Sequence, residues 1–220
     1  LPVCPQVTAE KRFWESLDLR GKVIYDIGAF QGILTLYFAS RGKHVVSYEP
    51  TSRNHRRLLE NLQLNNLTNV SVRNVGLGSS RGRATLFFQP LMPGGASLEP
   101  NAAKGMQRFA HVTEEISITT LDEDIRENGL PAPEFIKIDV EGPESEVLRG
   151  AQETLASHPP LFLEMHGETM NEKRRKCAEV VAILEQAGYR DILHVESASR
   201  ITSANTSVAA QGHLYCLRDR

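Results

Sequence analysis

Short apolar runs alternate with amphipathic segments along most of this chain. Residues 23–27, 44–48 and 135–139 are apolar runs, each followed within three residues by glycine or proline, and this pattern is typical of buried strands. Between such runs apolar residues recur at helical spacing, as in residues 52–64. Strands that alternate with helices predict a mostly parallel sheet with helices on both faces. We therefore expect an α/β fold, formed by a single domain over residues 1–220.

The two ends of the chain depart from this alternation. Residues 8–19 predict a helix within an N-terminal segment of residues 1–20. Residues 190–195 and 213–217 predict a terminal antiparallel strand pair, and the polar segment 197–212 between them is expected to be exposed. With strands also expected at 70–75 and 161–165, the sheet should contain seven strands.

An insertion is expected in the middle of the chain. Alternating residues at 83–88 and 116–119 predict two extra strands, which we expect to be antiparallel. The segment 89–114 between them is rich in proline and glycine, and a loop of that length in a compact domain is usually functional. We interpret it as a lid or substrate loop. Helices are expected at 33–40 and 144–155.

Composition narrows the class of protein. The formal net charge of −2 gives no electrostatic reason to expect a nucleic-acid partner, and the basic cluster 173–176 is interpreted as a solvated helix face. No apolar run approaches the roughly 20 residues that span a bilayer, so no membrane segment is expected. The three cysteines are widely separated and odd in number, which favours a reducing, cytoplasmic location.

The first strand ends in a glycine turn with the spacing Gly28-x-x-x-Gly32. Such a turn lets a ligand approach the backbone and the N-terminus of the next helix. Phe30 stands where the second glycine of a dinucleotide fingerprint would be, and its bulk disfavours a pyrophosphate. Asp26 suits a ligand with a cationic amino group. The alternative is a turn that only packs the helix against the strand.

Glu49 follows the second strand and is expected at the carboxyl edge of the sheet. A carboxylate at this position can accept hydrogen bonds from both hydroxyls of a ribose. Enzymes that use NAD share this feature, so Glu49 indicates a ribose without specifying the cofactor. The alternative is a solvated strand-end glutamate.

Acidic residues cluster after the fourth strand. Asp139, Glu141 and Glu144 lie within six residues, where they repel one another unless a cation is near. Glu144 also suits the start of a helix after Pro143, so its role can be purely structural. The apolar run before Asp139 should place it at the carboxyl edge of the sheet.

The fifth strand ends in Glu164 and His166, which the sheet should bring toward Asp139 and Glu141. One interpretation makes His166 or a carboxylate the general base for a substrate hydroxyl. A second lets Asp139, Glu141 and Glu164 or His166 hold a divalent cation that lowers the pKa of the hydroxyl. The spacing matches no known metal motif, so the base is favoured and no metal is expected. A hydrogen-bonded structural histidine is the third alternative.

In this order the motifs resemble the FkbM family of S-adenosylmethionine (SAM)-dependent methyltransferases. The resemblance extends from Asp26 to about His166, and its most specific block is Lys137-Ile138-Asp139-Val140-Glu141-Gly142-x-Glu144. The other matching motifs are Asp26-x-Gly28-Ala29-x-x-Gly32, Glu49-Pro50, Asn61-x-x-x-Asn65, Gly95-Ala96-Ser97-Leu98, Thr120-Leu121-Asp122, Leu148-x-Gly150-Ala151 and Glu164-x-His166. Phe30 and the pair Thr51-Ser52 depart from the family pattern.

The resemblance implies a class I, Rossmann-like methyltransferase fold that uses SAM and releases S-adenosylhomocysteine (SAH). It implies O-methylation of a small molecule such as a polyketide or a sugar. Glu49 would bind the ribose, and the backbone at Val75 and Gly76 would approach the adenine. The residues that would line the methionine part of SAM are Asp26, Gly28, Ala29 and Gly32.

Two alternative functions remain at this point. An NAD(P)-dependent oxidoreductase uses a related sheet, but Phe30 and Ile33 stand where its second and third glycines would be. A SAM-binding module without catalysis would not need the acids Asp139, Glu141 and Glu164. The motifs give neither the acceptor nor the oligomeric state.

Overall fold

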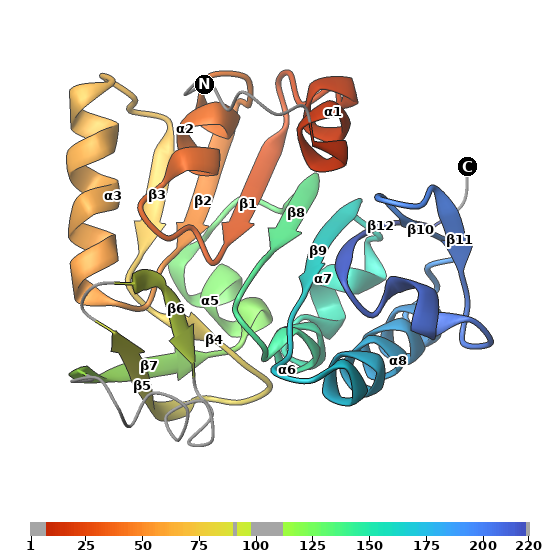
Figure 1. The fold of residues 1–220 in the computed structure, drawn as a ribbon. Helices are drawn as coiled ribbons and strands as arrows, with labels where there is room; N and C mark the ends of the chain where they lie inside the picture. The colour runs from red at the N-terminus through yellow and green to blue at the C-terminus, as the bar shows by residue number, and fades with distance from the viewer. Residues whose placement is uncertain (1–7, 90–91, 98–111, 219–220) are drawn as a thin grey trace.

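The computed structural model describes residues 8–89, 92–97 and 112–218 (Figure 1). At its centre is an eight-stranded sheet with the order β11-β10-β12-β9-β8-β1-β2-β3. The strands from β3 to β9 in that order are parallel to one another. Their bounds are β1 Val23–Ile27, β2 His44–Tyr48, β3 Val70–Arg73, β8 Phe135–Ile138 and β9 Leu161–Met165. The α/β fold with a mostly parallel sheet is confirmed.

The outer edge of this sheet is antiparallel. β12 (Gly212–Leu217) pairs with β9 and with β10 (Asp191–His194), so the expected terminal pair is confirmed. A further strand, β11 (Ser199–Ile201), pairs with β10 and brings the sheet to eight strands, where seven were expected. The segment 197–212 is therefore not simply an exposed loop, since Ile201 is buried.

Helices cover both faces of the main sheet. Trp14 of α1 and Phe38 of α2 pack on one face against Phe135 and Phe162. Helices from α5 to α8 contribute to the core on the other face. The expected helix 144–155 is interrupted at Gly150, where a Cβ would lie 2.0 Å from the carbonyl oxygen of Gly78. The helices are α1 Ala9–Ser16, α2 Ile33–Ala39, α3 Ser52–Leu64, α5 Leu121–Asn128, α6 Glu144–Arg149, α7 Gln152–Ala156, α8 Met170–Gln186 and the 3-10 helix η1 Thr206–Ala209.

A second sheet lies beside the carboxyl ends of the parallel strands (Figure 1). It has the order β4-β7-β5-β6, and β5 pairs antiparallel with β7 as expected. β6 was not expected, because it lies within the segment interpreted as a loop; its proline and glycines are tolerated at the edge of a sheet. Residues 98–111 of that segment lie outside the described residues. The strands are β4 Gly76–Leu77, β5 Gly82–Gln89, β6 Met92–Ser97 and β7 Val112–Thr119.

The basic cluster 173–176 lies in α8. Of the basic cluster 173–176, Lys176 is buried and pairs with Glu172 at 2.8 Å, so only part of the cluster is a solvated face. Across the described part of the chain, no helix combines the length and apolar character that crossing a bilayer needs.

Candidate active site

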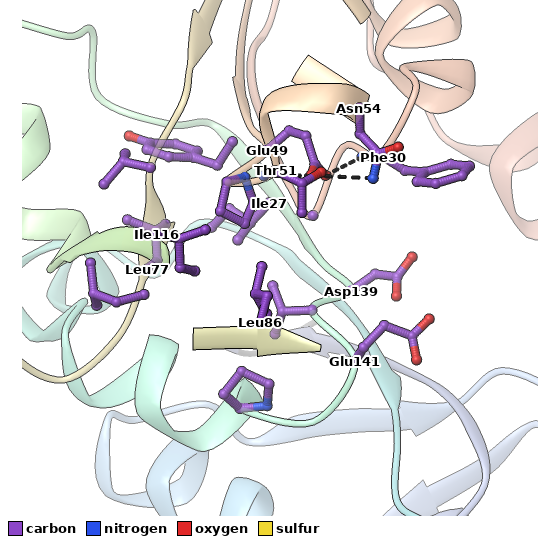
Figure 2. A pocket seen from close by; sticks show the side chains of 18 residues that line it. Ile27, Phe30, Glu49, Thr51, Asn54, Leu77, Leu86, Ile116, Asp139 and Glu141 are labelled. Atoms are coloured by element: carbon purple, nitrogen blue, oxygen red, sulfur yellow. Dashed lines mark hydrogen bonds between the residues drawn. The ribbon is translucent and has the colours of Figure 1, made fainter. Parts of the chain in front are cut away.

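A cleft lies between the carboxyl ends of β1, β2 and β8 and the second sheet (Figure 2). In this view the carboxylates of Asp139 and Glu141 lie toward one side, and Leu77 and Ile116 lie toward the other. The cleft therefore has an acidic end and an apolar end. Its lining residues are Ile27, Gly28, Phe30, Tyr48, Glu49, Pro50, Thr51, Asn54, Val75, Gly76, Leu77, Leu86, Ile116, Ile118, Asp139, Val140, Glu141 and Pro143.

Gly28 lies where the ends of three strands converge. Its φ is +79°, and a Cβ there would lie 1.7 Å from the carbonyl oxygen of Asp139. Its N–H donates to the carbonyl oxygen of Tyr48 at 3.1 Å. Glycine at this position therefore allows the turn to pass against β8, and Gly28 lines the cleft as expected.

Asp26 lies beneath the turn and does not line the cleft. Its carboxylate is fully buried, accepts a hydrogen bond from the Thr35 hydroxyl at 2.6 Å, and lies 3.2 Å from Lys137 Nζ. This placement does not fit the expectation that Asp26 meets a cationic amino group of the ligand. Its negative charge is instead balanced within the protein.

Lys137 connects this buried carboxylate to the cleft. Its Nζ donates to the carbonyl oxygen of Gly28 at 2.8 Å and lies 3.2 Å from a carboxylate oxygen of Asp139. Burial works against the charged ammonium, but Asp26 and Asp139 outweigh it and raise the pKa of Lys137. No role was predicted for Lys137 from the sequence. The available indication was the position of a lysine inside an otherwise apolar strand.

Ala29 and Gly32 serve the packing of α3 and are absent from the cleft lining. A Cβ on Gly32 would lie 2.2 Å from Leu58 Cδ1, and Ala29 is buried in a cluster with Leu58 and Leu62. The two residues therefore hold the helix close, as the alternative interpretation of the turn proposed. Their contact with the methionine part of SAM stays a prediction.

Glu49 is 5% exposed and lines the cleft at the end of β2. One carboxylate oxygen accepts the Thr51 N–H at 3.0 Å and the Thr51 hydroxyl at 2.5 Å, and the other accepts the Phe30 N–H at 3.0 Å. Burial raises the pKa of Glu49, although these hydrogen bonds act in the opposite direction. The carboxylate is thus fixed in orientation before any ligand binds.

The apolar end of the cleft comes largely from the second sheet. Val75 and Gly76 line it, as expected for the residues after β3. Leu77, Leu86 and Ile116 also line it and are buried, and none was identified from the sequence. Alternation within 83–88 and 116–119 was the available signal, but it could not show which face meets the cleft.

His166 lies at the acidic end, surrounded by carboxylates. Its Nδ1 is 2.7 Å from Glu144 Oε1, and its Nε2 is 3.6 Å from an oxygen of each of Asp139, Glu141 and Glu164. The structure therefore brings together the four residues expected to be catalytic. Asp139, Glu164 and His166 also offer ligand atoms within 4.8 Å of one another, as a metal ion would require.

The carboxylates around His166 affect which residue can act as the general base. Burial opposes the charged imidazole, but the hydrogen bond to Glu144 and the charges of Glu141 and Asp139 raise the pKa of His166 to about 9. A raised pKa makes the ring a poorer proton acceptor at neutral pH, and His166 is not among the lining residues of the cleft. These observations count against His166 as the base, and its assignment stays a prediction. Asp139 and Glu141 line the cleft instead.

Comparison with known proteins agrees with the geometry. Residues 26–190 match the methyltransferase FkbM domain. The chain is 28% identical over 192 residues to methyltransferase sdnD of Sordaria araneosa, covering 76% of this chain and 73% of the relative. It is 29% identical over 178 residues to the hexuronic acid methyltransferase AglP of Haloferax volcanii, covering 73% of this chain and 69% of the relative.

Among solved structures, the chain resembles a methyltransferase FkbM from Methylobacillus flagellatus KT, with a TM-score of 0.58 and 20% sequence identity. The similarity covers 96% of this chain and 48% of the other, so this chain spans about half the length of that protein. At this identity the likeness shows the class I methyltransferase fold. Because the domain match covers most of the chain, the protein belongs to the FkbM family of SAM-dependent methyltransferases.

Proposed function

We propose that this protein transfers the methyl group of SAM to a hydroxyl of a small molecule. The observation that carries the proposal is the continuity of the cleft. Glu49, suited to a ribose, and the acids Asp139 and Glu141 line the same space. A donor held at one end therefore faces proton-accepting groups at the other.

In this proposal Glu49 accepts the ribose hydroxyls, and the apolar side chains of the second sheet cover the adenine; both line the cleft. Bound SAM would supply a methyl group attached to a positively charged sulfur. In-line displacement would transfer this methyl group to the acceptor hydroxyl. Aligning the hydroxyl with this group can lower the barrier by roughly 7–11 kcal/mol. The carboxylates of the cleft thus orient the acceptor as well as accept its proton.

The proton of the hydroxyl must leave as the new O–CH3 bond forms. Glu141 is 44% exposed at its side chain and lines the cleft, so it can reach an entering acceptor. We assign Glu141 as the proton acceptor and Asp139 as its partner in orienting the hydroxyl. A positioned base of this kind contributes about 10²–10⁴-fold to the rate.

The acceptor class is supported by chemistry and by one relative. Carboxylates accept hydrogen bonds from hydroxyl groups, which suits a polyol or sugar. The relative AglP, 29% identical to this chain, is a hexuronic acid methyltransferase. We therefore place sugars first among the acceptors to be tested, ahead of polyketides.

The test uses SAM labelled with ¹³C at the methyl group and a panel of sugars and hydroxylated polyketides. The ¹³C chemical shift of the product distinguishes O-, N- and S-methylation. Asp139→Asn and Glu141→Gln should each lower turnover by about 10²–10⁴-fold while SAH affinity is kept. The matched control is Glu153→Gln, because Glu153 is exposed and is not among the lining residues of the cleft. Full turnover in both variants, or products methylated only on nitrogen, would contradict the proposal.

A further inference from the structure

We propose that Asp139, Glu164 and His166 bind one divalent transition-metal ion at the acidic end of the cleft. The sequence alone favoured a cluster without metal, and the three-dimensional positions change that preference. His166 Nε2 lies 3.6 Å from Asp139 Oδ1 and 3.6 Å from Glu164 Oε1. Ligand atoms at about 2.1 Å from one ion lie at most about 4.2 Å apart, so a single ion can contact each of these pairs as they stand.

The strand ends hold these ligands in place. Asp139 follows β8 and Glu164 lies within β9, its parallel neighbour, while His166 follows the last residue of β9. All three potential ligand atoms lie within 4.8 Å of one another. A three-ligand set requires the Asp139 and Glu164 oxygens to lie within about 4.2 Å of each other, which a side-chain rotation of either residue can supply.

The contact between Glu144 and His166 Nδ1 is a separate observation that indicates a ligand on the other ring nitrogen, Nε2. It is 1% exposed, and its Oε1 is 2.7 Å from His166 Nδ1. A buried carboxylate on one ring nitrogen is the usual partner of a metal-binding histidine, because it orients the other nitrogen toward the ion. The second oxygen of Glu144 is buried and has no hydrogen-bond partner among the described residues. A carboxylate buried in this way is costly unless positive charge is near.

The charges around the cluster also favour a cation. Six carboxylates and three cationic side chains meet there in the described structure, which leaves an excess of negative charge. The carboxylates are Asp26, Asp139, Glu141, Glu144, Glu164 and Glu196, and the cations are Lys137, His166 and His213. A bound divalent ion that replaces the Nε2 proton of His166 would add one net positive charge and so reduce this excess.

The donor set indicates the kind of ion. One imidazole nitrogen with two carboxylate oxygens suits Mn²⁺, Fe²⁺ or Zn²⁺ better than Ca²⁺, which prefers oxygen alone. Three protein ligands leave coordination positions open. Because Asp139 lines the cleft, an ion here would adjoin the acceptor hydroxyl and lower its pKa. This last consequence rests on the proposed function; the binding of the ion does not.

The experiment measures Mn²⁺ binding to the full chain, free of affinity tag and dialysed against EDTA, by electron paramagnetic resonance. We expect one ion per chain. His166→Gln and Asp139→Asn should each weaken binding at least tenfold, and Glu144→Gln should weaken it about 10–100-fold through the orientation of His166. Glu153→Gln is the matched control and should bind as wild type. Circular dichroism and SAH binding establish that each variant is folded.

Two results would overturn the metal site: no saturable Mn²⁺ binding at millimolar concentration, or binding that His166→Gln and Asp139→Asn leave unchanged. Methyl transfer measured on the same EDTA-treated protein separates the two proposals. Transfer without Mn²⁺ binding overturns the site and leaves the proposed function standing. Mn²⁺ binding without transfer to any hydroxyl supports the site and counts against the proposed function.

Discussion

The carbonyl oxygen of Asp139 lies 1.7 Å from the position that a Cβ on Gly28 would occupy. This close approach brings the end of β1 against the end of β8. It also places the glycine turn at residues 28–32 beside the acids Asp139 and Glu141. The close packing of the Gly28 turn against Asp139 therefore depends on the absence of a side chain at Gly28.

Gly28→Ala should destabilise the protein and weaken SAH binding. A methyl group there must displace the backbone of Asp139, and overpacking of this kind costs about 1–3 kcal/mol or more. The φ of +79° adds about 1–2 kcal/mol for a residue with a Cβ. Urea unfolding and calorimetric titration with SAH check both effects. Gly21→Ala is a useful comparison, because its φ is also positive but nothing lies within 4 Å of its Cβ position.

Lys137→Met should remove the cation between Asp26 and Asp139. Asp26 is fully buried, and leaving one member of a buried ion pair without its partner costs about 3–5 kcal/mol. The free energy of unfolding from urea titration measures the loss. Adding Asp26→Asn to the same protein should recover much of it, because the uncompensated charge is gone. If the double variant is no more stable than the single one, the charge on Asp26 is not the cause.

SAH affinity should depend on pH through Glu49. The ionised carboxylate is the form that accepts both ribose hydroxyls, and burial raises its pKa above the ordinary 4.5. Affinity should therefore be constant at neutral pH and should fall as the pH drops through this raised value. Glu49→Gln should bind about 10–100-fold more weakly, because a hydrogen bond to a charged group is worth about 1.5–3 kcal/mol. A pH profile in Glu49→Gln identical to wild type would show that another group is responsible.

Glu114→Ala should loosen the second sheet over the cleft. Glu114 Oε1 accepts the Ser52 N–H at 2.8 Å and the Ser52 hydroxyl at 2.5 Å, which fastens β7 to the start of α3. Loss of such a helix-end interaction costs about 1 kcal/mol. We expect the free energy of unfolding to fall by about 1 kcal/mol and SAH affinity to fall several-fold. Glu115→Ala, on the opposite face of the strand, should leave the affinity unchanged.

The parallel strands β1, β2, β8 and β9 were predictable because most of their residues are buried and form nearly continuous apolar runs. β11 was missed because a strand of three residues is too short to show a periodic pattern. β6 was missed because proline and glycine suggested a loop, although an edge strand tolerates both. In each case pairing with a neighbouring strand decided the structure, and local sequence does not record that pairing.

The site residues were likewise predictable only in part. Glu49, Asp139 and Glu141 were placed correctly at the cleft because each follows the carboxyl end of a parallel strand. Asp26 was expected to face the ligand, but it lies opposite Lys137 in the register of β1 and β8, where the two charges pair. That register joins positions far apart in the sequence. Knowledge of the strand order would have been needed to foresee it.

We have proposed that one cleft holds the donor at Glu49 and presents its methyl group to the acids Asp139 and Glu141. A crystal structure with bound SAH tests it most directly. We predict that the ribose hydroxyls lie within hydrogen-bond distance of the Glu49 carboxylate and that the sulfur faces Asp139 and Glu141. SAH bound with its ribose away from Glu49, or with its sulfur turned toward the second sheet, would contradict the account.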